Sequence, residues 1–235
     1  MIATMRNKAI SILSPGLDAA QTEAPSGQRL APEVRVLQIL DAALVEFSKR
    51  GFNAARMEDI ASGCGLSKGG LYAHFSSKDE IFKALLNRSL APPEWQEASP
   101  PPLEAGTRPF ARWVVDRLYA ALLERPAAAQ TLRLLAAERG RVKNLVDLWE
   151  HNVLQPNVAM LAELLRAHTA HHGLPESVIV REPWLVMAPV MHALLTQMVL
   201  GRDPVGGLES CRSHHVDLLC ELLDPRARIA AGSAP

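Results

Sequence analysis

Residues 57–82, MEDIASGCGLSKGGLYAHFSSKDEIF, decide the fold class of this chain. The apolar positions fit two short helices, Met57–Cys64 and Lys68–Phe75, and Gly65-Leu66-Ser67 forms the joint between them. Acidic residues at 58 and 59 suit the positive end of the first helix dipole. Ser67 stands where its hydroxyl can accept a hydrogen bond from the amide of Gly69 or Gly70 and so begin the second helix. The sequence therefore predicts a helix-turn-helix.

Helical patterns also flank this pair. Residues 36–50 place apolar side chains at helical spacing, and Gly51 follows Lys49-Arg50 where a left-handed cap is expected. Ser77 and Glu80 form a capping box that opens a fourth helix, whose apolar positions recur at helical spacing. Four helices are thus predicted between residues 33 and 90.

In a helix-turn-helix, the second helix enters the major groove of DNA. Leu66, Leu71 and Phe75 are expected to pack inward, which leaves the polar positions of the second helix exposed. Lysines can neutralise phosphates, tyrosine and histidine can hydrogen-bond them, and glycines allow the main chain to approach the duplex. The candidate DNA contacts are Ser67, Lys68, Gly69, Gly70, Tyr72, His74 and Lys78.

Charge and cysteine content narrow the class of protein. The 235 residues carry 25 Lys+Arg and 25 Asp+Glu, so the formal net charge is zero. Coating of nucleic acid through bulk positive charge is therefore excluded, and any basic DNA-binding face must be local. The three cysteines form no C-x-x-C pair, which predicts neither a disulfide framework nor a zinc site and favours the cytoplasm.

The rest of the chain has helical periodicity and no strand signal, so the expected fold is all-α. Prolines cluster between residues 91 and 102, which predicts a linker between two domains. The expected domains are a flexible arm (1–32), a helix-turn-helix domain (33–90), the linker (91–102), a larger helical domain (103–224) and a tail (225–235). Helices are expected over residues 103–124, 127–139, 142–172, 183–201 and 208–223.

Three stretches carry a resemblance to a known family. They are VLQILDAALVEFSKRGF (36–52), MEDIA (57–61) and GLSKGGLYAHFSSKDEIF (65–82), and together they strongly resemble the TetR/AcrR family. The resemblance implies a homodimeric bacterial transcription repressor with an N-terminal DNA-binding domain. It also implies a larger C-terminal helical domain that binds a small effector molecule and forms the dimer.

Two positions depart from the family's pattern. Arg56 stands where members often have Ser or Thr, and it cannot accept a capping bond, although it can reach a phosphate. Gly70 stands where members often have threonine. Losing that hydroxyl shifts base specificity toward other residues or toward DNA shape.

The second half offers candidates for an effector pocket and a dimer interface. Trp113, Arg117, Trp149, Asn152 and Met187 mix apolar and polar groups at helical spacing, as a pocket for a small, apolar effector requires. The two late apolar helices, 183–201 and 208–223, are expected to pair with their symmetry mates in a four-helix bundle. The expected interface residues are Leu218, Leu219 and Leu222.

Other functions fit these residues less well. Residues 65–69 match the G-x-S-x-G motif of hydrolases, but no strand precedes the serine, so no enzyme, catalytic residue or cofactor is predicted. The histidines at 168–172 and 214–215 are interpreted as solvated helix ends and not as metal ligands. The apolar segment 183–201 is interpreted as a helix packed between helices and not as a membrane span. A helical ligand-binding or scaffold protein whose helix-turn-helix contacts protein remains the alternative function.

Overall fold

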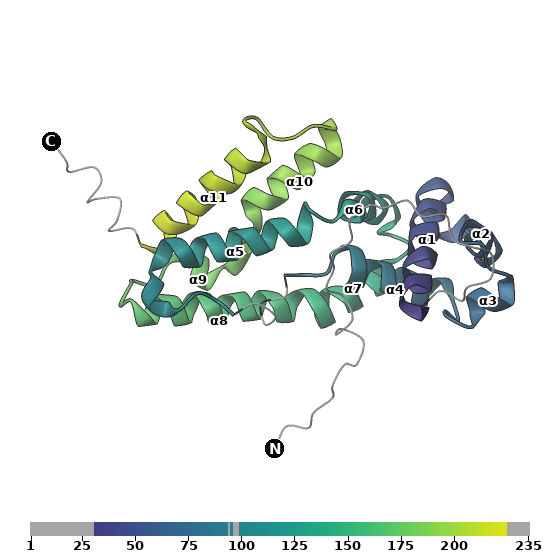
Figure 1. Cartoon of the computed structure of the whole chain (residues 1–235), viewed down its shortest axis with the longest axis horizontal. Helices are drawn as coiled ribbons and strands as arrows, with labels where there is room; N and C mark the ends of the chain where they lie inside the picture. Colours follow the sequence, from purple (N-terminus) through teal and green to yellow (C-terminus); the bar gives the residue numbers. More distant parts are fainter. Residues whose placement is uncertain (1–30, 94, 96–98, 225–235) are drawn as a thin grey trace, which may run out of the picture.

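The computed structural model describes residues 31–93, 95 and 99–224, and the described part is all-helical, as predicted (Figure 1). The predicted arm and tail lie outside these residues, apart from positions 31 and 32. The α-helices are α1 (Pro32–Ala54), α2 (Met57–Gly63), α3 (Lys68–Tyr72), α4 (Lys78–Ser89), α5 (Thr107–Leu122), α6 (Pro126–Glu138), α7 (Lys143–Trp149), α8 (Gln155–His171), α9 (Val178–Arg181), α10 (Ala188–Leu200) and α11 (Gly207–Leu223). Short segments of other helix types cover Leu103–Ala105, Glu150–Leu154 and Pro183–Met187.

The helix α1 starts earlier than its apolar pattern, at Pro32, whose fixed φ suits a first helical position. Its buried stripe includes Ile39, Ala43 and Phe47, as the sequence predicted. The regular helix ends at Gly51, which has a φ of 76°. A glycine with positive φ does end the regular helix, but its ψ of 161° is not that of the predicted left-handed cap, and the chain then makes one further turn to Ala54.

The three longest expected helices are each divided or shortened. The expected helix 142–172 consists of α7, a π-helical segment and α8, because Pro156 lacks an N–H and its ring would clash with the carbonyl four residues earlier. Gly106, with a φ of 85°, separates a short 3-10 turn from α5. The segment 183–201 begins as a 3-10 turn and becomes α10 only at Ala188. The short helix α9 was not expected from the sequence.

Two hydrophobic cores hold these helices, and their limits differ from the predicted domain limits. The first core joins α1 to α4 with residues of the later chain, including Ala128, Leu134, Val142 and Leu145. The second core is built from α5 and α8 to α11. Trp95, within the predicted linker, is 5% exposed and packs in the second core. The helices α6 and α7 therefore pack against the N-terminal helices, although they follow the proline-rich segment in the sequence (Figure 1).

Two histidines interpreted as solvated are instead buried, so that interpretation was wrong for them. His168 is 1% exposed, and its ring stacks on Phe110 with centroids 4.3 Å apart. Its Nε2 lies 3.2 Å from the hydroxyl of Thr107. His215 is 2% exposed beside Tyr119 in the second core. Burial lowers the pKa of each ring to about 4, so both are neutral near neutral pH.

One helical stretch, residues 183–200, is long and apolar enough to cross a membrane by length and composition. Its regular α-helical part, α10, has 13 residues and a length of about 20 Å, which is shorter than the hydrocarbon core of a bilayer. Only 22% of the stretch is buried within the protomer. A large apolar surface on this segment is therefore left without a partner in the single chain.

Candidate nucleic-acid interface

The predicted helix-turn-helix is formed by α2, the turn at 64–67 and α3. The φ of Gly65 is 68°, and the amide of Leu66 donates to the carbonyl of Ala61 at 2.8 Å, which turns the chain back after α2. Ser67 caps α3 as predicted, since its hydroxyl accepts from the amide of Gly70 at 3.1 Å. The helix α3 ends at Tyr72, earlier than the expected Phe75.

Burial fixes which face of α3 reaches solvent. Leu71 is fully buried and Phe75 is 8% exposed, and both pack in the core that contains Phe47, as predicted. Tyr72 is 45% exposed. Ser67, Lys68, Gly69 and His74 are also exposed, while Gly70 is half-buried. The structure thus brings the predicted polar contacts of the second helix to one end of the molecule, at α3 in Figure 1.

Lys68 carries an interaction that the sequence analysis missed. Its Nζ lies 2.5 Å from Glu58 Oε1, so the ion pair joins the first turn of α2 to the start of α3. The hydrogen bond with Glu58 raises the pKa of Lys68 and lowers the pKa of the glutamate. Both side chains are exposed, so this pair adds little to stability. It does place a carboxylate next to a predicted phosphate contact.

Arg56 precedes α2 with an extended backbone and makes no side-chain capping bond, as expected from its chemistry. Its side chain is exposed. Within the described ranges no hydrogen bond or ion pair to this guanidinium is seen. It is therefore open to an external anion.

Lys78 has a role that differs from the predicted phosphate contact. Its ammonium donates to three main-chain carbonyls, those of Phe52 (2.9 Å), Asn53 (3.0 Å) and Ala55 (2.9 Å). All three N–H donors of the lysine are thereby used. The side chain is half-buried, and its Nζ also lies 5.1 Å from the centre of the Phe52 ring. Lys78 thus closes the carbonyl end of α1, which its place in the sequence did not reveal.

Arg35 is a second residue that the sequence analysis missed. Its Nη1 donates to the carbonyl of Cys64, 29 residues later, at 3.4 Å, and to Gln38 at 2.9 Å. The arginine therefore links the start of α1 to the turn of the helix-turn-helix. No local signal marks such a contact, because it joins residues far apart in the sequence.

Neither of the two described pockets brings the five predicted effector residues together. Trp113 and Arg117 lie on α5, where the guanidinium is 5.0 Å from the indole ring centre, and Trp113 packs on the second core. Trp149 packs against the first core, and Asn152 is exposed on the π-helical segment. Only Met187 lines a described cavity, a space of about 20 Å³ near Trp95 and Leu161, which is too small for a ligand. The expected grouping is therefore not seen.

The predicted dimer residues also separate. Leu219 is 1% exposed and belongs to the core of its own protomer, so its assignment to the interface was wrong. Leu222 is half-buried against the same core. Leu218 is 43% exposed and remains a candidate. Two apolar side chains on α10 have a larger exposed fraction than Leu218: Leu195 is 47% and Val199 is 71% exposed.

Three features of the described residues bear on the hydrolase, metal and redox sites. Ser67 follows a helix, not a strand, and its hydroxyl is used as a cap. Among the described residues no group of three or more His, Cys, Asp or Glu side chains is placed to hold a metal ion. Cys64 is half-buried, and burial raises the pKa of its thiol, as expected for a small packed side chain.

Comparison with known proteins supports the interpretation of this site. Residues 39–85, which span α1 to α4, match the family model described as bacterial regulatory proteins, tetR family. The chain is 48% identical over 62 residues to the HTH-type transcriptional activator FasR of Mycolicibacterium smegmatis, a match that covers 26% of this chain and 28% of FasR. It is 43% identical over 49 residues to the transcriptional repressor KstR2 of Mycobacterium tuberculosis, covering 21% of this chain and 24% of KstR2.

The matched segments thus span about a quarter of the length of these relatives. Over most of the chain, the fold resembles a TetR family transcriptional regulator from Pseudomonas syringae, with a TM-score of 0.58 and 20% identity over 83% of this chain and 96% of that one. At this identity the likeness concerns the fold alone. Residues 39–85 thus match the DNA-binding segment of the tetR family of bacterial regulatory proteins, and the described chain shares the fold of a TetR family transcriptional regulator.

Proposed function

We propose that this chain is a cytoplasmic, homodimeric transcription repressor that binds a pseudo-palindromic operator and is released from it by a small effector. The exposed face of α3 carries the proposal. Leu71, which is fully buried, anchors this short helix, while Lys68 and Gly69 in its first turn and Tyr72 at its last position are left exposed. A recognition helix presents the same arrangement to the major groove.

The proposed DNA contacts are Arg56, Ser67, Lys68, Gly69, Gly70, Tyr72 and His74. Arg56 makes no hydrogen bond or ion pair with the residues of 31–224 that the structure describes, and although its charge acts on nearby Glu58, its N–H donors are available to a phosphate. Tyr72 can donate its hydroxyl to a phosphate oxygen. Lys78 is proposed as a support of this surface instead of a direct contact, because its donors are bound to main-chain carbonyls.

Two recognition helices about 34 Å apart are needed to read two half-sites, which requires a dimer. We place the interface on the outward faces of α10 and α11, which lie side by side in Figure 1. Leu195, Val199 and Leu218 are exposed there, and pairing two copies would bury them. Leu195→Glu and Val199→Glu are expected to give monomers in light scattering at micromolar concentration. Val45→Glu, an exposed apolar position on α1, is the matched control and should stay dimeric.

Fluorescence anisotropy with DNA from immediately upstream of the gene, against scrambled DNA at two salt concentrations, tests the proposed activity. A preference of at least about 10³-fold for the upstream DNA would support a specific regulator. Tyr72→Ala is expected to weaken binding to all sequences, and Tyr72→Phe, which lacks only the hydroxyl, should lose part of the same affinity. Equal and weak binding to both fragments would favour the alternative, a scaffold whose helix-turn-helix contacts protein.

The direction of regulation needs its own assay. One of the two relatives compared above is described as an activator and the other as a repressor, so similarity leaves the sign open. A promoter-fused reporter in cells with and without the chain distinguishes them. We expect reporter output to rise when the gene is removed, and a fall would overturn the repressor assignment.

A further inference from the structure

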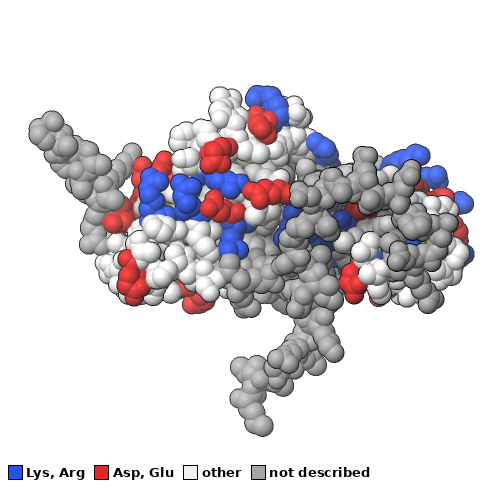
Figure 2. All heavy atoms as spheres, viewed as in Figure 1, with Lys and Arg blue, Asp and Glu red and all other residues white. Residues whose placement is uncertain are grey.

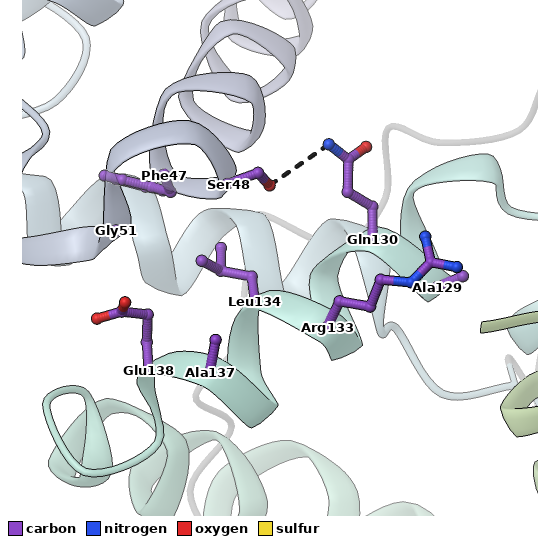
Figure 3. Close-up of a pocket in the computed structure, with 9 residues that line it drawn as sticks. All are labelled: Phe47, Ser48, Gly51, Ala129, Gln130, Arg133, Leu134, Ala137 and Glu138. Atoms are coloured by element: carbon purple, nitrogen blue, oxygen red, sulfur yellow. Dashed lines mark hydrogen bonds between the residues drawn. The ribbon is translucent and has the colours of Figure 1, made fainter. Parts of the chain in front are cut away.

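A cavity of about 570 Å³ lies between α1 and α6, outside the surfaces considered above (Figure 3). This volume falls within the usual range of small-molecule sites. Its apolar wall includes Phe47, Leu134 and Ala137, and its polar groups come from Ser48, Gln130, Arg133 and Glu138. Gln130 Nε2 and Ser48 Oγ are 3.4 Å apart and form the hydrogen bond drawn across the space. The cavity therefore separates a helix of the DNA-binding unit from a helix that follows the proline-rich segment.

Glu138 gives this cavity a negative end. The side chain is 8% exposed although it carries a carboxylate. It is the last residue of α6, and it lies against Gly51, where the regular part of α1 ends. The C-terminus of α6, with its partial negative charge, therefore adds to a nearly buried carboxylate, whereas the carbonyl end of α1 is already closed by Lys78. A cation placed there would be attracted by the carboxylate and by the end of α6.

The neighbouring cations satisfy this site only in part. Arg141 approaches Glu138 from solvent, and its Nη1 lies 3.2 Å from both carboxylate oxygens, which leaves part of their acceptor capacity free. Arg50 is paired with Glu46 and Asp59. Arg133, toward the other side of the cavity, donates from Nε to the carbonyl of Met198 at 3.1 Å. Its charge disfavours a cation at that side and so orients a ligand.

We infer that this cavity binds a small amphipathic cation, with a protonated amine at Glu138 and an apolar body against Ala137 and the exposed edge of Leu134. The amine would share the carboxylate with Arg141 or displace it. The apolar body would occupy the space between α1 and α6. The proposed ligand site between α1 and α6 contains none of the five effector residues predicted from the sequence.

The position of the cavity suggests how its ligand would act, and this step rests on the proposed function. Ligand between α1 and α6 would replace the Ser48–Gln130 hydrogen bond and change how the two helices pack. Through Arg35, α1 is bonded to the turn that precedes α3. A shift of α1 would therefore move the recognition helix, and the effector would need only a higher affinity for the shifted state.

Three isosteric probes test the site itself on the full chain without DNA. They are 4-phenylbutylamine, 4-phenylbutanol and 4-phenylbutyrate, followed by titration in ¹H–¹⁵N NMR spectra. We expect the amine to bind with a dissociation constant of about 1 mM, in keeping with its size, and at least about tenfold more tightly than the other two. Equal binding of all three, or no shifts near α1 and α6, would overturn the assignment.

Four variants locate the site. Glu138→Gln should remove the preference for the amine, whereas Arg141→Gln, at an exposed competing group, should strengthen amine binding and leave the alcohol unchanged. Ala137→Phe should fill the cavity and abolish binding of the amine, while Ala136→Phe, the exposed neighbour that does not line it, should have no effect. Binding that survives Ala137→Phe would contradict the proposal even if Glu138→Gln failed to fold.

The effect on DNA is measured separately. At saturating amine the operator affinity is expected to fall at least about tenfold, and Ala137→Phe should lose this response. Amine binding in NMR without any change in DNA affinity would overturn the coupling. A chain that binds no specific DNA would overturn the proposed function, and the NMR titration would still decide the cavity.

Discussion

Replacing Lys78 with methionine tests whether this lysine closes α1 or contacts DNA. Methionine keeps most of the stem but loses the ammonium, so three main-chain carbonyls lose their donor. A hydrogen bond to a charged group contributes about 1.5–3 kcal/mol, but water can replace the bond to Asn53, which is exposed. Ordering the lysine side chain also costs about 2 kcal/mol of entropy. We therefore expect a net loss of about 2 kcal/mol in the free energy of unfolding, or roughly 4–8 °C in Tm.

Urea unfolding at fixed protein concentration measures this loss, and operator binding at several salt concentrations measures the DNA contact. Lys83→Met is the matched control, because Lys83 is exposed on the same helix. It makes no hydrogen bond or ion pair with any described residue. If Lys78 closes α1, the Lys78→Met variant should be less stable than the control and should bind DNA with the same salt dependence as the control. Unchanged stability, together with a slope reduced by about 0.9 for each protomer bound relative to the control, would refute the capping role and restore the phosphate contact.

Three further predictions concern glycine, histidine and the ion pair at α3. Gly51→Ala should lower the free energy of unfolding by about 1–3 kcal/mol, because the φ of this glycine is 76° and an added Cβ would lie 2.7 Å from Glu138 Oε1. The control is Gly69→Ala, which has open space around the added Cβ and should not lower the free energy of unfolding in the same urea assay. Burial and two neighbouring histidines lower the pKa of His168 to about 4, so unfolding takes up protons and stability should fall as pH drops from about 6.5 toward 4. The variant His168→Gln should make that profile shallower in urea titrations across pH, with His215 still contributing, and an unchanged profile would exclude His168 as one of its sources. Glu58→Gln frees the ammonium of Lys68 and removes a carboxylate from the proposed DNA-binding face. Fluorescence anisotropy should therefore show tighter binding to scrambled DNA and a steeper salt dependence than for the unchanged chain. Equal salt dependences would contradict this prediction.

The sequence by itself determined the local elements of the DNA-binding unit. Apolar spacing predicted α1 to α4, the hydroxyl of Ser67 predicted a helix start that is observed, and Gly51 predicted a helix end that is observed. These features depend on residues within one or two turns of each other, so they can be deduced from spacing and side-chain chemistry. The family resemblance rests on the same segment and is confirmed over residues 39–85.

Tertiary structure decided which helices share a core and which polar groups meet. Periodicity shows that α6 buries one stripe, but only the fold shows that the stripe packs on the N-terminal helices and leaves a cavity beside Glu138. Tertiary contacts also decided three other features: the burial of His168, the inward position of Leu219 and the bonds of Lys78 at the end of α1. Each feature depends on residues that are distant in the sequence. A local pattern indicates that a side chain can be buried or hydrogen-bonded, but it does not identify the partner.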